Sequence, residues 1–372
     1  MLSNEIIYQI FVRNFSDEGT FQKVKEDLPR IKELGADIVY LMPIHPIGEL
    51  NRKGTYGSPY SISNYFAITE DYGTLEDFIS LIDSVHELGM KLIIDMVFNH
   101  TSYDNVLVAN HPEYYFYRDG KMGNRVGEWS DIADLDTSRY DTKEYMLSVL
   151  KYWVKQGVDG FRFDVASMIP LDFFIMAREE LGPDIIFIGE SIDPGFASYL
   201  RSIDDAPTPD KDMFPTFDSL YNYSWFRSFI SYINGESTID KFVKDFNEDN
   251  ESLKNKGIRL NCLENHDNER IANLVSSEKL QQLLDLFAHL KGQLFIYAGQ
   301  EYGNKHKPEL FEKDPIIWKK DEKTLSLYKK AIKTKKKLPP IDYQSLEKIG
   351  EHKIRLISYK DEKVVDTREF EI

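Results

Sequence analysis

Charged side chains interrupt a short apolar run at residues 160–167, GFRFDVAS. Arg162 and Asp164 lie two residues apart there, and side chains of a β-strand alternate between its two faces. The pattern therefore predicts Arg162, Asp164 and Ala166 on one face and the residues between them on the other. An unpaired carboxylate is costly to bury, so the two charges indicate either a structural ion pair or a functional site.

Three other apolar runs also end in residues that can do chemistry. They are DMVFNH with Asp95, Asn99 and His100, FIGES with Glu190, and CLENHD with His266 and Asp267. Each ending by itself is compatible with a loop cap or with the first turn of a helix. If the runs are strands of one closed sheet, their polar ends converge on a single mouth.

Two chemistries suit such a cluster. The first is a metal site holding zinc, manganese or two metal ions, because histidine and carboxylate side chains are its usual ligands. Its ligands would come from Asp95, His100, Asp164, Glu190, His266 and Asp267. The second is glycoside hydrolysis, which needs one carboxylic acid and one carboxylate. Arg162 favours the second, because a guanidinium beside Asp164 keeps it ionised and competes with a cation.

Short apolar runs alternate with amphipathic stretches along most of the chain. The predicted strands are 6–15, 37–43, 91–98, 160–166, 185–191, 213–219, 259–265 and 293–301. The predicted helices include 20–34, 74–88, 142–156, 279–291 and 319–337. Eight strand–helix units predict an α/β fold of the (β/α)₈ TIM-barrel type, whose functional residues come from the C-terminal ends of the strands.

Two segments depart from this alternation. Residues 100–139 are polar, aromatic and too long for an ordinary connection, so we expect a small inserted domain after the third strand. Residues 339–372 predict a short or truncated C-terminal β domain, with antiparallel strands that turn at KDEK. The barrel would then comprise residues 1–99 and 140–338.

Composition excludes several classes of protein. The formal net charge of −16 argues against binding to nucleic acid or to an anionic membrane. Cys262 is the only cysteine, so no intrachain disulfide can form. The N-terminus lacks a basic segment before its apolar run, and no apolar stretch reaches membrane-spanning length. We expect a cytoplasmic protein, unless a leader has been removed.

The motifs taken together resemble the alpha-amylase family of glycoside hydrolases (glycoside hydrolase family 13) over nearly the whole chain. DMVFNH, GFRFDVAS, FIGES and CLENHD match the four short regions that define that family. IADLD at 132–136, MPIHP at 42–46 and IYAGQE at 296–301 match further regions. The stretch that begins SPYSISNYF is similar to the family segment whose tyrosine, here Tyr60, stacks on a sugar.

The resemblance implies a role for each of three carboxyl groups. Asp164 would be the nucleophile that forms a covalent glycosyl–enzyme intermediate. Glu190 would be the general acid and then the base, with retention at the anomeric carbon and with its pKa held up by the neighbouring carboxylates. Asp267 would bind sugar hydroxyls and help to distort the ring.

The resemblance also implies the residues that hold the substrate. Arg162 would keep Asp164 ionised and oriented, and Tyr60 would be the stacking platform. His100 and His266 would bind hydroxyls of the same sugar, with Asp95 supporting them. The expected substrate is an α-glucan oligosaccharide.

Some positions depart from the family pattern. Ser167 and Met168 stand where many members have Lys and His, which bind the glucan and support a calcium ion. Asn99 and Asp134 match two calcium ligands, but the histidine is missing, so the sequence gives only an incomplete calcium set. The reaction itself requires no cofactor. These features predict a small intracellular enzyme that cleaves α-1,4 bonds in short maltodextrins.

Two alternatives remain open. An α-glucan transglycosylase or an α-1,6-glucosidase of the same family would carry the same motifs. A non-catalytic glucan-binding relative would be expected to have lost Asp164, Glu190 or Asp267, and all three are present.

Overall fold

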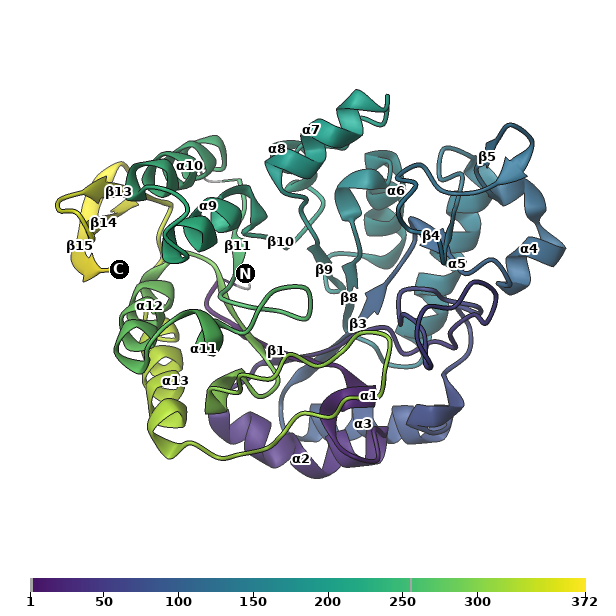
Figure 1. The fold of residues 1–372 in the computed structure, drawn as a ribbon, viewed down its shortest axis with the longest axis horizontal. Helices are drawn as coiled ribbons and strands as arrows, with labels where there is room; N and C mark the ends of the chain where they lie inside the picture. The colour runs from purple at the N-terminus through teal and green to yellow at the C-terminus, as the bar shows by residue number, and fades with distance from the viewer. Residues whose placement is uncertain (1–2, 255) are drawn as a thin grey trace.

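Eight parallel strands close into a barrel at the centre of the molecule (Figure 1). The strands are hydrogen-bonded in the order β1-β12-β11-β10-β9-β8-β3-β2, and β2 closes the ring against β1. Their bounds are β1 Ile6–Ile10, β2 Ile38–Leu41, β3 Lys91–Met96, β8 Gly160–Phe163, β9 Ile186–Gly189, β10 Ser219–Tyr221, β11 Arg259–Cys262 and β12 Gln293–Tyr297. This arrangement confirms the predicted (β/α)₈ barrel.

The molecule is described here by a computed structural model that covers residues 3–254 and 256–372. Residues 1 and 2, which belong to the predicted barrel range 1–99, and residue 255, in the range 140–338, lie outside the described residues.

Helices surround the barrel and connect its strands (Figure 1). The longer ones are α2 Phe21–Leu34, α3 Leu75–Glu87, α5 Tyr140–Lys155, α6 Leu171–Leu181, α7 Pro194–Ser202, α9 Tyr223–Ile233, α10 Ile239–Ser252, α12 Ser277–His289 and α13 Glu322–Lys335. Short helices are α1 Val12–Phe15, α4 Val106–Asn110, α8 Asp210–Met213 and α11 Ile271–Leu274. Their apolar faces pack on the outer face of the barrel, with residues such as Phe161 and Phe163 between the two layers. A second, smaller core fills the barrel interior and includes Ile7, Ile93 and Phe295.

The inserted segment between β3 and α5 contains little regular structure. It has the two short antiparallel pairs β4 His100–Thr101 with β7 Ala133–Asp134, and β5 Tyr117–Arg118 with β6 Lys121–Met122. The register places His100 opposite Asp134, so β7 returns to the end of the third barrel strand. The insertion therefore stands over the C-terminal edge of the barrel.

The chain ends in a three-stranded antiparallel sheet, at the opposite end of the molecule from the inserted segment (Figure 1). Its strands are β13 Tyr343–Lys348, β14 Lys353–Lys360 and β15 Lys363–Glu371, and the chain turns between β14 and β15 at the predicted KDEK. Asn247 of α10 fastens the sheet to the barrel, because its side chain exchanges hydrogen bonds of 2.9 and 2.7 Å with the backbone of Leu346.

One predicted strand is wrong. Residues 213–219 were expected to be extended, but α8 ends at Met213 and β10 begins only at Ser219. Pro215 lacks the N–H that a central strand must donate, and Phe214 and Phe217 are buried as side chains of a turn. The first predicted strand, 6–15, also ends early, at Ile10, and α1 occupies its second half.

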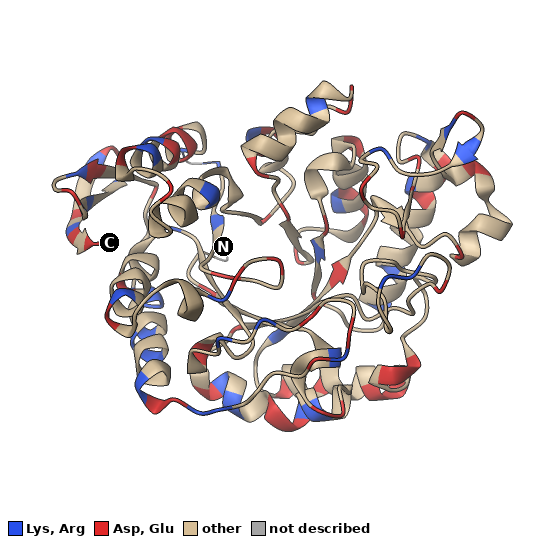
Figure 2. Ribbon diagram, viewed as in Figure 1, with Lys and Arg blue, Asp and Glu red and all other residues tan. Residues whose placement is uncertain are grey.

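Charged residues of both signs cover the outer helices, and some lie on the central strands (Figure 2). Within the residues that the structure describes, no helix is long and apolar enough to cross a membrane.

Candidate active site

Arg162 lies at the centre of a cluster of carboxylates at the C-terminal ends of β3, β8 and β9. It pairs in register with Asp95 on the neighbouring strand, and both side chains are almost fully buried. Nη1 of Arg162 donates to both carboxylate oxygens of Asp95, at 2.8 and 3.0 Å, and to Oδ1 of Asp164 at 2.9 Å. Tyr40 of β2 also donates to Asp95. The interior face of the barrel thus holds one cation among several acids.

Glu190 follows β9 and meets the same guanidinium. Its Oε1 lies 3.0 Å from Nη2 of Arg162, and its Oε2 accepts a 2.7 Å hydrogen bond from the backbone N–H of Val165. Arg162 therefore contacts Asp164 through one terminal nitrogen and Glu190 through the other. The two carboxylates are held side by side.

The backbone after Asp164 differs from the predicted continuous strand. β8 ends at Phe163, and Val165 has a left-handed conformation with φ of 35°. The predicted alternation holds for Arg162 and Asp164, whose side chains meet, but Ala166 belongs to a short helical turn instead. This turn points the Val165 N–H at Glu190. The change from strand to turn therefore provides a backbone hydrogen bond to the Glu190 carboxylate.

Burial sets the proton affinity of the carboxylate pair. It raises the pKa of Glu190 to about 7; Arg162 opposes that rise and Asp267 adds to it. Burial and the charge of Glu190 also raise the pKa of Asp164 well above its usual range, against the lowering effect of Arg162. The predicted direction for Glu190 is confirmed, although burial is the largest cause. The expected lowering effect of Arg162 on the pKa of Asp164 is present, but burial and the charge of Glu190 act against it.

His266 and Tyr60 are hydrogen-bonded to each other and to this cluster. Nε2 of His266 lies 2.7 Å from the Tyr60 hydroxyl and 3.2 Å from Oδ2 of Asp267. The Tyr60 hydroxyl in turn donates to Asp95 at 3.0 Å. One hydrogen-bonded chain therefore joins His266 to Asp95 and Arg162.

These groups line an open cavity of about 350 Å³, within the size range of small-ligand sites. The lining residues are Lys53, Ser58, Tyr60, His100, Trp129, Asp131, Ile132, Asp164, Val165, Glu190, His266, Asp267, Leu310 and Phe311. Burial lowers the pKa of His100 to about 4, so its imidazole is neutral at physiological pH. The cavity combines carboxyl groups, neutral imidazoles and aromatic faces, which is a suitable lining for a polyhydroxylated ring.

Of the two calcium candidates, Asp134 is paired with an arginine through one of its carboxylate oxygens. Asp134 Oδ2 accepts from the backbone N–H of Arg125 at 2.7 Å and from Nη1 of Arg125 at 3.2 Å. A guanidinium thus stands against the carboxylate that would bind calcium. Asn99 contacts Nδ1 of His100 through its amide nitrogen, at 3.2 Å. Among the described residues, no group of three or more His, Cys, Asp or Glu side chains is arranged to hold a metal ion.

The structure brings together all eight residues that the sequence predicted for catalysis or substrate binding. The sequence analysis did not identify the neighbours that hydrogen-bond to them or line the cavity with them. Gln9 lies 2.9 Å from Nδ1 of His266, and Tyr40 contacts Asp95. Both are polar residues inside apolar strands, which is the signal that could have identified them. Lys53, Asp131 and Trp129 lie in loops, where residue type alone carries no such signal.

A parallel barrel with two carboxylates bridged by one arginine at its C-terminal strand ends is an arrangement suited to glycosidic bond cleavage. The family model for the alpha-amylase catalytic domain matches residues 9–131, 126–185 and 179–348. The chain therefore belongs to the alpha-amylase family of glycoside hydrolases, and it is a glycosidase.

Relatives with solved structures span nearly the whole chain. An alpha-amylase from Lactobacillus plantarum is 39% identical, with a TM-score of 0.91, and the match covers 96% of this chain and 86% of that one. A maltogenic alpha-amylase from Thermotoga neapolitana is 32% identical, with a TM-score of 0.81 and 95% and 85% of the two chains covered.

More distant relatives have two different activities in their names. Alpha-amylase 3 of Dictyoglomus thermophilum is 27% identical over 86% of this chain and 68% of its own length. Probable oligo-1,6-glucosidase 2 of Bacillus subtilis is 23% identical over 88% of this chain and 69% of its own length.

Proposed function

We propose that this protein is a retaining glycosidase that cleaves α-1,4-glucosidic bonds in maltodextrins. The observation that carries the proposal is the contact of one buried guanidinium, that of Arg162, with both Asp164 and Glu190 at the floor of the cavity. The names of two solved relatives, 39% and 32% identical to this chain, support the α-glucan class of substrate.

The contacts that Asp164 and Glu190 share favour retention. Retaining glycosidases hold their carboxyl groups about 5–5.5 Å apart, whereas inverting enzymes leave room for a water between them. Asp164 and Glu190 contact adjacent nitrogens of one planar guanidinium, and Glu190 also binds the backbone next to Asp164. Both contacts keep the pair close.

The reaction then follows in two displacements. A carboxylate oxygen of Asp164 attacks the anomeric carbon while Glu190 gives its proton to the glycosidic oxygen, and the C–O bond to the leaving sugar breaks. Glu190 then takes a proton from water, which attacks the same carbon and releases Asp164. The pKa of Glu190 near 7 provides a protonated acid for the first step at neutral pH.

The remaining residues bind the sugar whose bond is cleaved. Tyr60 offers an aromatic face beside His266, and its ring lies 5.9 Å from the guanidinium carbon of Arg162. Asp267 keeps an exposed carboxylate, 47% accessible, at the rim of the cavity, where it can accept hydrogen bonds from sugar hydroxyls. His100 is neutral, so it can donate one ring N–H to a hydroxyl, and Asp267 beside His266 can accept from another.

The two displacements use no cofactor. Arg125 neutralises Asp134 at the position where the family pattern would place calcium, so we propose that the inserted domain (residues 100–139) is held without this ion. A cytoplasmic location remains a prediction from the sequence, and the proposed partner is an α-glucan oligosaccharide.

The test incubates the purified protein with maltoheptaose, pullulan, isomaltose and sucrose, beside Asp164→Asn and Glu190→Gln variants. We expect shorter maltodextrins from maltoheptaose, with loss of at least about a thousandfold in kcat for either variant. Products longer than the substrate would reassign the protein as a transglycosylase, and cleavage of isomaltose alone would make it an α-1,6-glucosidase. No turnover of any of these α-glucosides would contradict the proposal.

A further inference from the structure

Two loops on one side of the cavity are joined to each other by main-chain contacts. Residues 52–57 follow β2, and residues 309–314 follow β12. Tyr56 donates its backbone N–H to the carbonyl of Phe311 at 3.0 Å, and Thr55 donates its own to the carboxylate of Glu312 at 2.9 Å. Gly54 approaches so closely that an added Cβ would lie 2.7 Å from Phe311. We call this joined pair of loops the β2/β12 wall.

The residues that follow β1 brace this wall from below. Nη1 of Arg13 donates to the carbonyl of Gly57 at 3.0 Å and to that of Leu310 at 3.1 Å, so one buried guanidinium holds both loops. Asn14 adds a 2.8 Å bond to the carbonyl of Glu309 and accepts from the backbone of Asp314 at 2.9 Å. The wall is therefore fixed by side chains that lie beneath it.

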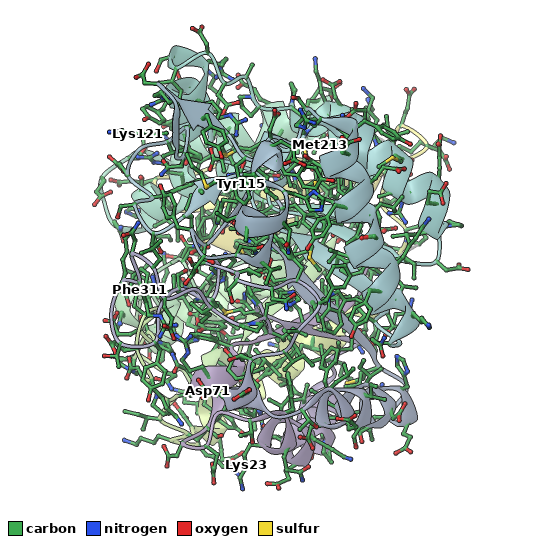
Figure 3. All side chains as sticks on the ribbon, turned by 90° about the vertical axis from the view of Figure 1, so that its right-hand side faces the viewer. Lys23, Asp71, Tyr115, Lys121, Met213 and Phe311 are labelled. Carbon is green, nitrogen blue, oxygen red and sulfur yellow. The ribbon has the colours of Figure 1, made fainter. Side chains whose placement is uncertain are left out.

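An ion pair extends the wall to the inserted domain. Nζ of Lys53 lies 2.7 Å from Oδ1 of Asp131, whose side chain is 7% exposed. Lys53, Leu310 and Phe311 all line the same cavity as Asp164 and Glu190. Phe311 lies at the margin of the molecule, between the inserted domain marked by Tyr115 and Lys121 and the barrel side marked by Asp71 and Lys23 (Figure 3).

The position of the β2/β12 wall relative to Glu190 determines which part of the substrate the wall can contact. β9, which carries Glu190, is four strands from β1 in either direction around the closed barrel, so the wall above β1 stands across the mouth from the proposed acid. The leaving sugar must lie on the side of Glu190, because that residue protonates its oxygen. The sugars that remain on the enzyme must then extend toward the wall.

We propose that the β2/β12 wall closes the glycone side of the cavity, so that the enzyme acts at the non-reducing ends of maltodextrins and releases short products. This inference rests on the proposed function and specifies its substrate: the chain end rather than the chain interior. The Lys53–Asp131 pair and the side chains of Leu310 and Phe311 would set how far the glycone can extend.

The test compares maltoheptaose with maltoheptaose whose non-reducing glucose is capped at O4 and O6. A closed glycone side has no space for the cap, so we expect kcat/KM for the capped substrate to be at least about tenfold lower. Products from maltoheptaose labelled at its reducing end should initially be one short unlabelled oligosaccharide and one long labelled one.

A variant that opens the β2/β12 wall provides a second test. Phe311→Gly combined with Lys53→Ala should raise kcat/KM for the capped substrate at least about fivefold relative to the uncapped one. Glu309→Ala is the matched control, because its side chain is exposed on the same loop and only its backbone contributes to the wall. It should leave the ratio unchanged.

Equal cleavage of both substrates by the wild type, with a random mixture of products, would overturn the inference and leave the proposed hydrolysis intact. Absence of hydrolysis of either substrate would contradict the proposed function instead. If the double variant fails to fold, the comparison of capped and uncapped maltoheptaose on the wild-type protein still tests the inference.

Discussion

The imidazole of His266 stacks on the ring of Tyr60, with ring centroids 5.4 Å apart and 15° between the ring planes. Burial lowers the pKa of His266, so the ring is neutral and carries a single proton. In the orientation found here, the Gln9 amide nitrogen donates to Nδ1, so the proton is on Nε2 and points at Tyr60 and Asp267. The Tyr60 hydroxyl is then free to donate to Asp95.

Gln9 is therefore expected to position His266 without touching substrate. In a Gln9→Leu variant, Nδ1 loses its donor and the imidazole can adopt either tautomer, so kcat should fall about tenfold. The ring ¹⁵N chemical shifts of His266 should change from one tautomer to a mixture. Gln293→Leu, which removes another buried glutamine of the barrel, is the control and should change neither. An unchanged tautomer with unchanged kcat would show that Gln9 has no positioning role.

The activity should fall as pH rises through about 7. Burial and Asp267 raise the pKa of Glu190, and the acid must be protonated to act, so the fraction of enzyme with a protonated Glu190 falls as pH rises through about 7. An Asp267→Asn variant removes one negative neighbour, which lowers the pKa of Glu190. The alkaline limb of its kcat/KM profile should therefore move to lower pH, apart from any loss in rate.

Asp285→Asn is the control for this experiment, because Asp285 is an exposed acid on α12. It removes the same charge far from the cavity and should leave the limb in place. A limb that moves upward in Asp267→Asn, or that does not move, would contradict the electrostatic account.

The sequence alone was sufficient to predict the site residues whose chemical type the reaction requires. Arg162 lies near the end of an apolar strand, and Asp164 and Glu190 follow such strands. Because the carboxyl ends of parallel strands meet at one edge, their convergence could be predicted. The roles assigned to them remain proposals. β10 could not be placed, because its three residues carry too short a pattern and the aromatic residues before it imitate a strand.

Contacts between residues of different loops also could not be predicted from the sequence. Lys53 and Asp131 come from different loops far apart in the chain, and only the folded positions of those loops make them an ion pair. The same holds for Arg125 and Asp134: the sequence matched Asp134 to a calcium ligand, and only the structure shows a guanidinium at its carboxylate.

Removal of calcium should not affect this protein. A site filled at a hundred times its dissociation constant adds about 2.7 kcal/mol to the free energy of unfolding, which a thermal melt detects easily. We expect the same melting temperature and activity in excess chelator and in excess calcium. An Arg125→Met variant should lose about 2–3 kcal/mol of stability, because Asp134 then keeps a buried carboxylate without its partner.

Arg118→Met is the matched control, an exposed arginine on β5 of the same inserted domain. It should change the melting temperature little. A clear rise in the melting temperature of the wild type with calcium would show that a cation binds despite Arg125.

Lys335 of α13 is buried, and its replacement should stabilise the protein. Burial lowers the pKa of Lys335 to about 7, and its ammonium contacts the carbonyl of Leu290. In the unfolded chain the lysine has an ordinary pKa near 10.4 and is protonated at neutral pH. Protonation is less favourable in the folded state, so it reduces the free energy of unfolding. This cost is complete below pH 7 and fades as pH rises toward the unfolded pKa. Lys335→Met should raise the free energy of unfolding by about 1–3 kcal/mol at pH 7.

The gain should shrink when the same pair of proteins is melted at pH 9.5, because the wild-type lysine then folds in its neutral form at little cost. Lys333→Met, on an exposed position of the same helix, is the control for added hydrophobicity and helix propensity, and it should give no gain at either pH. A loss of stability in Lys335→Met at pH 7 would mean that the bond to Leu290 outweighs the cost of burying the charge. A gain that stays constant with pH would mean that methionine packs better and that protonation plays no part.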